Sequence, residues 1–445
     1  MSNIRDDDSC VNKPFPRVIS VDFTDVVPTK WEDKVREEKK ETLEKFLPTY
    51  HMEFPDEALY GTAGDIVRKL MPETETHPGA ILSHILLRFG NIIGRTAYTQ
   101  TESTRHFCNL FVVLVGATAK ARKGTANDRV EHIFSGIDPA WESTRQLGGF
   151  GSGEGVIAII RDDQSVTVKG KTHLVPGVED KRLFIREGEF SRILAVGKRE
   201  GNLLSQILRD AWDSKTLRNS VKNNPQTATD PHVSAVCDIT QHEINLRLED
   251  ADTYNGFANR FLWIFVERTK LKPFGGKEID WSRERKRLRD AVRFARQQER
   301  MFMAEDARVM WRRNYAQLSA SLEGIVGGIT SRAETQVLRL SLIYALLDCS
   351  DHIRSTHLQA ALAVWDYALR SVHHIFAKNG VISPVQQRIL DQANNGPTSL
   401  AEFREVVFKR NRPVELITAD LKALESKKLL ATTENENGVT EWFMI

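Results

Sequence analysis

Four short apolar runs, separated by helical stretches, constrain the fold of this 445-residue chain more than any other feature. The first run, "LFVVLVG", is continuously apolar, rich in β-branched residues and ends in glycine. A run of this kind is typical of a strand buried on both faces of a parallel sheet. The other runs are "LFIR", "HVSAVCDIT" and "RFLWIFV", with helical patterns such as "EGNLLSQILRDAWD" between them. Strands that alternate with helices predict an α/β core with a mostly parallel sheet.

The first apolar run leads into a basic loop, "GATAKARKGTA", and then into a predicted helix. A phosphate-binding P-loop has the form G-x-x-x-x-G-K-[ST], in which backbone N–H groups and a lysine hold the phosphates and a hydroxyl holds Mg²⁺. Here Lys123 lies one place too late, and Gly124 separates it from Thr125. Two interpretations are open: a nucleotide-binding loop with an inserted residue, or a basic loop that binds a sulfate, a nucleic-acid phosphate or nothing.

The nucleotide interpretation gives most residues of this loop a role. We expect Lys123 to reach the phosphates and the hydroxyl of Thr125 to bind Mg²⁺. Small residues such as Thr118 would leave room for close approach. The predicted nucleotide-binding residues of the loop are Gly116, Thr118, Arg122, Lys123, Gly124 and Thr125.

A P-loop ATPase also needs an acidic residue at the end of a second apolar strand, to hold Mg²⁺ and polarise water. The stretch "RLFIREGEF" places Glu187 at such a strand end and Glu189 two residues further on. We assign Glu187 to the Mg²⁺ shell and Glu189 to activation of the attacking water, and the reverse assignment stays open. The alternative is a pair of surface carboxylates on a loop.

The third apolar run ends in polar residues that could contact the γ-phosphate or the attacking water. The stretch "VSAVCDITQHE" offers Asp238, Thr240 and His242, of which we favour Thr240 as a nucleotide contact. Asp238 inside an apolar strand is unusual for a pure core element, but it can also simply end the strand.

The fourth apolar run is preceded by the motif "ANRF", which places Asn259 and Arg260 directly before a strand. We predict that Asn259 contacts the nucleotide and that Arg260 is catalytic. An arginine there can stabilise negative charge on a transferring phosphoryl group, in the same chain or across a subunit interface. The alternative for Arg260 is a structural salt bridge, and Arg332 is a lesser candidate for the same role.

The order of several motifs resembles a family of helicase-like P-loop ATPases of unknown function from phages, plasmids and integrated elements, associated with primase or replication genes. The motifs are "GDIVRKL", "FGNIIGR", "LFVVLVGATAKARKGT", "GSGEGVIAIIRDD", "FIREGEFSRIL", "LRDAWDS", "NGFANRFLW" and "LRLSLIYALLD". The resemblance implies an R-K-G-T variant of the P-loop, ATP and Mg²⁺ as cofactors, and a RecA-like or helicase-like ATPase activity. By position it assigns functional roles to Lys123, Thr125, Glu187, Glu189, Asn259 and Arg260.

The fold class we expect is α/β, with a RecA-like P-loop NTPase core, flanking helical regions and a C-terminal winged-helix domain. A polar arm and helix are predicted over 1–55, and a helical subdomain over 56–105. The ATPase core follows over 106–272 and a helical region over 273–378. Residues 379–445 combine three short helices with a hairpin around "NENG", which predicts the winged helix.

The net charge of the chain is only +2, so any surface that binds nucleic acid must be a local basic segment. Two segments are candidates. The stretch "WSRERKRLRDAVRFARQQER" carries a basic stripe at helical spacing, formed by Arg285, Arg289, Arg293, Arg296 and Arg300. The alternative is a solvated helix with local ion pairs. The C-terminal domain carries nine Lys/Arg and nine Asp/Glu over 378–445, so DNA and protein are both open as its partner.

These features favour an ATP- and Mg²⁺-dependent ATPase that acts on single-stranded DNA or a replication fork, as a replicative helicase or helicase loader of a mobile genetic element. The expected partners are DNA, further copies of the chain, and a primase or other replication protein. One alternative is a slow nucleotide-gated switch in phage defence or regulation, whose winged helix recruits a protein. Another is a non-catalytic DNA-binding protein with a degenerate P-loop.

Cysteine usage and hydropathy bear on where the chain is found. The four cysteines form no C-x-x-C pair, which predicts reduced thiols in a cytoplasmic protein. No apolar run approaches the roughly 18 residues that a membrane helix needs, so we expect no membrane contact.

Overall fold

The structure is a computed structural model. It describes residues 52–117, 120–168, 171–219, 225–248, 255–322, 324–376, 384–426, 429–435 and 438–444. The predicted arm and helix over 1–55 lie outside the described residues, apart from 52–55.

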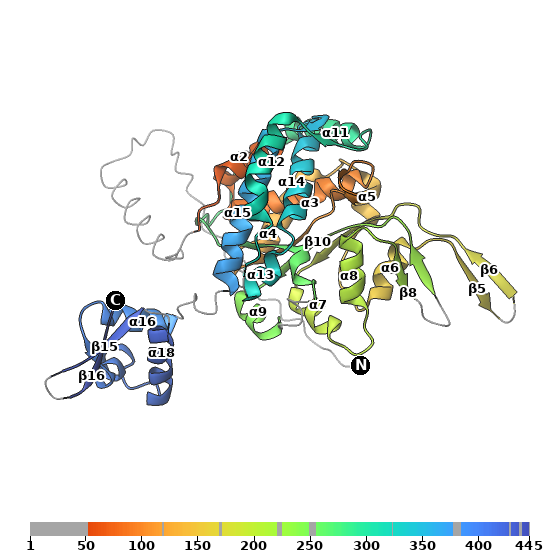
Figure 1. Cartoon of the computed structure of the whole chain (residues 1–445). Helices are drawn as coiled ribbons and strands as arrows, with labels where there is room; N and C mark the ends of the chain where they lie inside the picture. The colour runs from red at the N-terminus through yellow and green to blue at the C-terminus, as the bar shows by residue number, and fades with distance from the viewer. Residues whose placement is uncertain are drawn as a thin grey trace, which may run out of the picture. The chain divides into compact units, whose positions relative to one another are not determined.

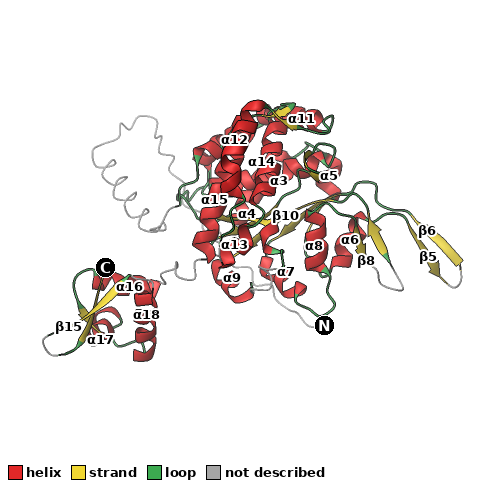
Figure 2. Cartoon of the chain, viewed as in Figure 1, coloured by secondary structure: helices red, strands yellow, loops and turns green. Residues whose placement is uncertain are grey.

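A five-stranded parallel sheet forms the centre of the core (Figures 1 and 2). Its strands are β3 (Phe111–Val115), β4 (Gln146–Leu147), β7 (Arg182–Glu187), β10 (His232–Ile239) and β11 (Phe261–Phe265). They lie in the order β11-β3-β10-β7-β4, and every neighbouring pair is parallel. The four apolar runs form four of these strands, so the predicted α/β class with a parallel sheet is confirmed. Strand β4 was not predicted because it has only 2 residues and no apolar run.

Helices lie on both faces of the sheet (Figure 1), and side chains that alternate along the strands pack against them. On one face, Leu114, Val236 and Leu262 share a core with helices that include α3 (Pro78–Ile93), α4 (Lys123–Phe134), α11 (Ser282–Ala295) and α14 (Ala333–Leu347). On the other face, Val113 and Ile185 share a core with helices that include α6 (Gly153–Ile160), α7 (Phe190–Gly197) and α8 (Leu204–Trp212). Burial on both faces explains why these strands are continuously apolar.

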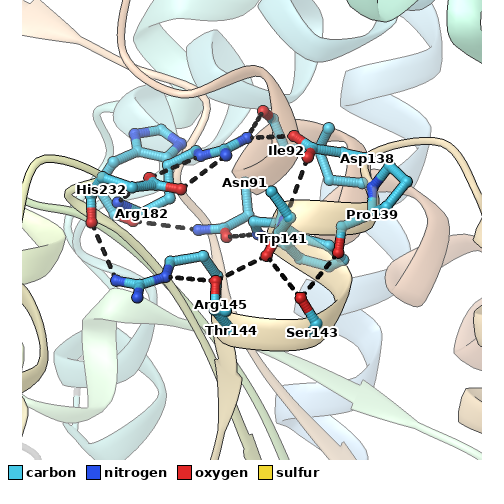
Figure 3. Close-up of polar contacts among 12 residues, drawn as sticks. Asn91, Ile92, Asp138, Pro139, Trp141, Ser143, Thr144, Arg145, Arg182 and His232 are labelled. Atoms are coloured by element: carbon cyan, nitrogen blue, oxygen red, sulfur yellow. Dashed lines mark hydrogen bonds and ion pairs between the residues drawn. The ribbon is translucent and has the colours of Figure 1, made fainter.

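Helix α3 is buried along its length and is fixed to the sheet by polar contacts at the amino ends of the strands (Figure 3). The side-chain amide of Asn91 donates to the carbonyl oxygens of Leu183 and His232, each at 3.1 Å. Its oxygen accepts the indole N–H of Trp141, from α5 (Pro139–Thr144), at 2.7 Å. Asn91 thereby uses both ends of its amide to join two strands and a helix, which satisfies polar groups that are buried there.

Further elements complete the core. The helices are η1 (Asp56–Ala58), α2 (Gly61–Leu70), η2 (Met71–Glu73), α9 (Gln241–Arg247), η3 (Ala258–Arg260), α12 (Glu305–Leu318), α13 (Gly324–Thr330) and α15 (Ser355–Phe376). The antiparallel strand pairs are β1 (Thr99–Thr101) with β2 (Thr104–His106), β5 (Gln164–Val168) with β6 (Lys171–Val175), and β8 (Leu217–Asn219) with β9 (Gln226–Ala228). A short parallel pair joins β12 (Phe302–Met303) and β13 (His352–Ile353). Not one helix in the described part of the chain has both the length and the apolar character needed to cross a membrane.

The C-terminal domain consists of helices and a small sheet around its own apolar core. Its helices are α16 (Pro384–Ala393), α17 (Leu400–Glu402), which leads into the π-helical turn η4 (Phe403–Val407), and α18 (Val414–Ser426). Its antiparallel strands β14 (Thr398–Ser399), β15 (Leu430–Glu434) and β16 (Thr440–Met444) lie in the order β14-β16-β15. The helices and the hairpin lie where the sequence predicts them, and β14 is an additional short strand.

Candidate functional site

The carboxyl ends of β3 and β10 meet at one edge of the sheet, and Lys123 lies between them. Its ammonium group donates to the carbonyl oxygens of Gly116 at 2.8 Å and Ile239 at 3.1 Å. Lys123 is also the first residue of α4, so the free N–H groups of the first helical turn lie at the same edge. Ligands of open parallel α/β sheets bind outside the carboxyl ends of the strands. The lysine predicted for phosphate binding is therefore at the ligand-binding edge.

The residue before Lys123 has a left-handed backbone conformation. Arg122 has φ 54° and ψ 32°, a region in which non-glycine residues are uncommon. The standard P-loop pattern has a glycine directly before the lysine, so this loop has a left-handed arginine where that glycine is expected. Arg122 Nε donates to Glu75 Oε2 at 2.8 Å, and Arg268 Nη1 lies 3.5 Å from the same oxygen. Arg122, predicted to contact the nucleotide, is held by a carboxylate in this structure.

The two glycines of the loop have different surroundings. A Cβ atom at Gly116 would lie 2.2 Å from the carbonyl oxygen of Val266, so this glycine is required by the close approach of the chain that follows β11. A Cβ atom at Gly124 would meet nothing within 4 Å in the part of the chain that the structure describes. Thr125 is exposed in the same helical turn. Gly124 and Thr125 thus present an open face of α4, whereas Thr118 lies outside the described residues.

The two acidic residues predicted for catalysis differ in burial. Glu187 is the last residue of β7 and is 7% exposed, and its Oε2 accepts the N–H of Gly149 at 3.1 Å. Gly149 belongs to the glycine-rich stretch after β4, so that stretch lies beside Glu187. The register pairs Glu187 with Cys237 of β10, which places it at the same edge as Lys123. Glu189 is exposed at the start of α7. A buried carboxylate suits a fixed metal ligand, and an exposed one suits contact with water.

A third carboxyl group, that of Asp238, lies at the same edge, one residue before the end of β10. Burial raises its pKa to about 6, although the charges of Lys123 and Arg186 act to lower it. Burial also lowers the pKa of Lys123, which the charge of Asp238 acts to raise. Thr240, which the sequence favoured, uses its hydroxyl to cap α9: it accepts the N–H of Glu243 and donates to Glu243 Oε2 at 2.8 Å. Asp238 is therefore the side chain of β10 whose charge acts on Lys123.

Arg260 lies at the opposite edge of the sheet from Lys123. It directly precedes β11, whose first residue pairs with Phe111, the first residue of β3. A parallel strand of 5 residues spans about 16 Å, so Arg260 cannot reach a phosphate group beside Lys123 in its own chain. The predicted role within one chain is excluded by this separation, while a role across a subunit interface stays a prediction.

Arg260 instead belongs to a buried ion pair, which is the alternative that the sequence left open. Its Nη2 donates to Asp213 Oδ2 at 2.8 Å, and Arg332 Nη1 lies 3.6 Å from Asp213 Oδ1. Burial acts to raise the pKa of Asp213, but the hydrogen bond from Arg260 and the charge of Arg332 bring it below its usual value. Asn259 accepts a hydrogen bond from Arg332 Nε at 3.1 Å and donates to Ser331 Oγ at 2.8 Å. Asn259 therefore also belongs to this cluster and not to the edge that carries Lys123.

The predicted basic stripe lies only in part on α11, because the helix ends at Ala295 and Arg296 and Arg300 follow it. Several arginines of the stripe make contacts within the chain. Arg285 donates to two main-chain carbonyl oxygens near the end of α4. Arg296 Nη2 donates to Asp138 Oδ2 at 2.6 Å, and Arg293 lies 3.4 Å from Asp290. These contacts agree with a helix that carries local ion pairs, and nucleic-acid contact through this stripe stays a prediction.

Two carboxylates of these edges were not identified from the sequence. Asp213 follows Trp212 at the end of α8. Arg260 is the signal that could have indicated such a carboxylate, because an arginine buried beside an apolar strand needs an acidic partner. Glu75 lies in the loop before α3, within "PETETHP", where nothing distinguishes it from its neighbours.

The candidate site thus consists of Lys123, the first turn of α4, Glu187, Glu189 and Asp238, gathered at the carboxyl edge of the sheet. Arg260, Asn259 and Arg332 form a separate cluster at the amino edge. No protein-family model matches this chain, and a search of curated proteins finds no match to it.

Proposed function

We propose that this chain is an ATP- and Mg²⁺-dependent P-loop ATPase with a RecA-like core that acts on DNA, as a replicative helicase or helicase loader of a mobile genetic element. The observation that carries the proposal is the position of Lys123. Its ammonium lies between the carboxyl ends of β3 and β10, at the first turn of α4. A lysine at this point of a strand, loop and helix is the arrangement with which P-loop proteins bind phosphate.

The strand order supports a RecA-like core. The acidic residues follow β7, but β7 does not lie beside β3: β10 is inserted between them. An inserted strand between the P-loop strand and the acidic strand is typical of RecA-like ATPases. The inserted strand carries Asp238, whose carboxyl group is subject to the charge of Lys123.

The residues at this edge fit a nucleotide with its metal ion. Lys123 and the N–H groups of the first turn of α4 would hold the phosphates, and the open face at Gly124 leaves room for them. The hydroxyl of Thr125 and the carboxylate of Glu187 would hold Mg²⁺, which prefers oxygen ligands. Bound ATP supplies the phosphoanhydride bond to be hydrolysed, and Mg²⁺ neutralises charge on its phosphates.

Two side chains are available to orient water or hold a proton. Glu189 is exposed beside the predicted metal ligand, and we assign it to activation of the attacking water. Asp238, with a pKa raised to about 6, changes its protonation state close to neutral pH and interacts with Lys123. We assign it to the γ-phosphate side of the site, the position for which the sequence had favoured Thr240. Groups with such shifted pKa values often mark functional sites.

The test is steady-state ATP hydrolysis by the wild type and by Lys123→Ala, each with and without single-stranded DNA. Lys120→Ala is the matched control, because Lys120 is an exposed lysine of the same loop. We expect hydrolysis that rises with DNA, that is lost in Lys123→Ala and that is retained in Lys120→Ala. Equal activity in the two variants, or no hydrolysis by the wild type under either condition, would contradict the proposal.

A slow nucleotide-gated switch is the second candidate, and the contacts of Glu75 favour it. Glu75 Oε2 accepts from Arg122, and Glu75 Oε1 accepts the N–H of Lys272 at 2.6 Å. This carboxylate therefore links the P-loop to the segment that follows β11. A phosphate group that binds Arg122 would compete with Glu75 and release the link. A switch of this kind would bind ATP and turn it over slowly, with no response to DNA.

The C-terminal domain gives this second candidate further support. Its three helices and small antiparallel sheet are the elements of a winged helix, which we propose as its fold. Of the basic residues ahead of α18, Arg412 Nη2 lies 2.6 Å from Asp420 Oδ2, and Arg410 pairs with Glu405. Cations that are already paired favour a protein partner over a DNA backbone for this domain.

A further inference from the structure

A cleft of about 450 Å³ lies at the amino edge of the sheet, at the opposite end of the strands from Lys123. Its volume falls within the range of small-ligand sites, which is about 300–1,000 Å³. The turn between β1 and β2, the end of α8, and residues of α12 and α14 line it. The cleft is therefore distinct from the candidate ATPase site.

Guanidinium groups gather around one indole ring in this cleft. The guanidinium carbon of Arg339 lies 3.8 Å from the ring centroid of Trp212, that of Arg332 at 5.2 Å and that of Arg260 at 5.8 Å. Asp213 is the carboxylate that pairs with two of them. Arg260 does not line the cleft, whose lining carries four cations against three carboxylates and therefore an excess of one positive charge: Arg105, Lys215, Arg332 and Arg339 against Glu102, Asp213 and Glu334. Such an excess attracts an anion.

Two buried donors in the same place lack acceptors. Arg339 is 2% exposed and donates through Nη1 and Nη2 to the carbonyl oxygens of Asn109 and Trp212. Its Nε has no hydrogen-bond partner among the residues that the structure describes, and the same holds for Nε1 of Trp212, which is 1% exposed. Both side chains line the cleft. Buried donors are seldom left unpaired in proteins, so acceptor atoms are lacking beside the cleft.

Aromatic side chains of α12 lie at the same cleft. Trp311 and Tyr315 both line it, with their ring centroids 5.7 Å apart, and Tyr315 is 50% exposed. Aromatic faces beside arginine are the means by which proteins stack a base next to its phosphate. The carboxylates of Glu102 and Glu334 also line the cleft, and they disfavour a ligand that carries negative charge along its whole length.

We propose that this cleft binds a nucleotide phosphate, with the phosphate at Arg332 and Arg339 and the base against Trp311 and Tyr315. Arg332 is the more accessible of the two, with a side chain that is 32% exposed, and its guanidinium can donate to phosphate oxygens. The same chemistry is offered by a free nucleotide and by the phosphorylated end of a single strand. The proposal does not depend on ATP hydrolysis at the carboxyl edge.

The test measures binding in a Lys123→Ala background, which removes the candidate P-loop contact. Calorimetric titrations use ATP and a 5′-phosphorylated oligothymidylate as separate probes. We expect one of them to bind, with ATP indicating a free nucleotide and the oligothymidylate a strand end. Adding Arg332→Gln should lower the affinity about tenfold, the effect of losing a charge-assisted hydrogen bond. Adding Tyr315→Ala should also lower the affinity. Because Tyr315 is exposed, this variant keeps its fold even if Arg332→Gln disturbs the fold.

The matched control adds Arg312→Gln instead. Arg312 belongs to the same helix as Tyr315, its side chain is 70% exposed, and it does not line the cleft. Its replacement should leave the affinity unchanged. Absence of binding of both probes to Lys123→Ala, or equal affinities after the Tyr315 and Arg312 substitutions, would overturn the proposal. Hydrolysis by the wild type is measured separately, so failure of this proposal is distinguishable from failure of the ATPase proposal.

Discussion

Arg122 Nε and Glu75 Oε2 lie 2.8 Å apart, so the arginine that precedes the P-loop lysine is bound by a carboxylate from the loop before α3. The same arginine has a left-handed backbone, which costs a non-glycine residue roughly 1–2 kcal/mol. An exposed ion pair contributes only about 0–1 kcal/mol. The salt bridge therefore does not fully offset the backbone strain at this position.

Replacing Arg122 by glycine or by alanine should separate the backbone strain from the salt bridge. Both substitutions remove the contact with Glu75, but only glycine relieves the left-handed strain. We expect Arg122→Gly to be more stable than Arg122→Ala by about 1 kcal/mol, measured as free energies of unfolding in urea. Equal stability of the two variants would show that the left-handed conformation is not retained in solution.

The two glycines of the loop should respond in opposite ways to alanine. Gly116→Ala introduces a Cβ atom 2.2 Å from the carbonyl oxygen of Val266, so we expect a loss of at least about 2 kcal/mol in the free energy of unfolding. Gly124→Ala places a methyl group in open space at the start of a helix, where alanine is favoured over glycine by about 0.5–1 kcal/mol. If phosphates bind against Gly124, the second variant should be stable and yet bind ATP more weakly. Thermal unfolding and nucleotide titration of both variants check this.

The burial of the two acidic residues predicts different effects of glutamine. Glu189→Gln changes an exposed side chain, so its stability should stay within about 0.5 kcal/mol of the wild type, whereas hydrolysis should fall at least about 100-fold. Glu187→Gln removes a buried charge that accepts the N–H of Gly149, so both stability and Mg²⁺-dependent nucleotide binding should fall. If catalysis were retained in Glu189→Gln and lost in Glu187→Gln, Glu187 would be the residue that activates water and Glu189 the Mg²⁺ ligand.

The raised pKa of Asp238 predicts how stability depends on pH. Its pKa is about 6 in the folded chain and about 3.9 when unfolded, so the folded state binds the proton more tightly between these values. Stability is therefore lost as pH rises from about 4 to about 6, because a buried carboxylate must then ionise. Asp238→Asn should stabilise the protein by about 1–3 kcal/mol at pH 7.5 and have little effect near pH 4. Urea unfolding at the two pH values measures this, and an equal effect at both would contradict it.

The ion pair at the amino edge predicts a large loss of stability on removal of Asp213. Asp213→Asn leaves the buried guanidinium of Arg260 without its counter-charge, and breaking a buried pair in this way costs about 3–5 kcal/mol. Glu334→Gln is a suitable control, because this carboxylate lines the same cleft. A loss of less than about 1 kcal/mol in Asp213→Asn would show that Arg260 is accessible to water and free for another partner.

The strands of the sheet could be predicted because their burial on two faces leaves an unmistakable apolar run. The small elements could not be predicted, since β4 has 2 residues and the paired strands β1, β2, β8 and β9 have 3 residues each, too few for a recognisable pattern. Lys123 and Glu187 were identifiable because one follows the loop after a strand whose end is evident and the other ends such a strand. The contacts of Arg122 with Glu75 and of Arg260 with Asp213 could not be predicted, because the two residues of each pair lie 47 positions apart in the chain.

The choice between Thr240 and Asp238 shows a further limit of sequence patterns. Both residues lie at the end of the same strand, and a hydroxyl is a common contact to a phosphate. Whether that hydroxyl is free depends on Glu243, three residues on, which completes a capping box with Thr240. The sequence does contain this signal, because Thr-x-x-Glu is the pattern of a capping box.

The opposite placement of Lys123 and Arg260 has a consequence for symmetry. The two residues belong to opposite ends of parallel strands, so a contact that brought Arg260 of one copy to Lys123 of the next would join two unlike surfaces. If the two copies lie antiparallel, a two-fold axis makes this contact twice, once at each end of the strands. If they lie head to tail, the contact repeats from copy to copy until it closes into a ring or continues as a filament. In each of these arrangements a copy within the assembly both gives an arginine and receives one.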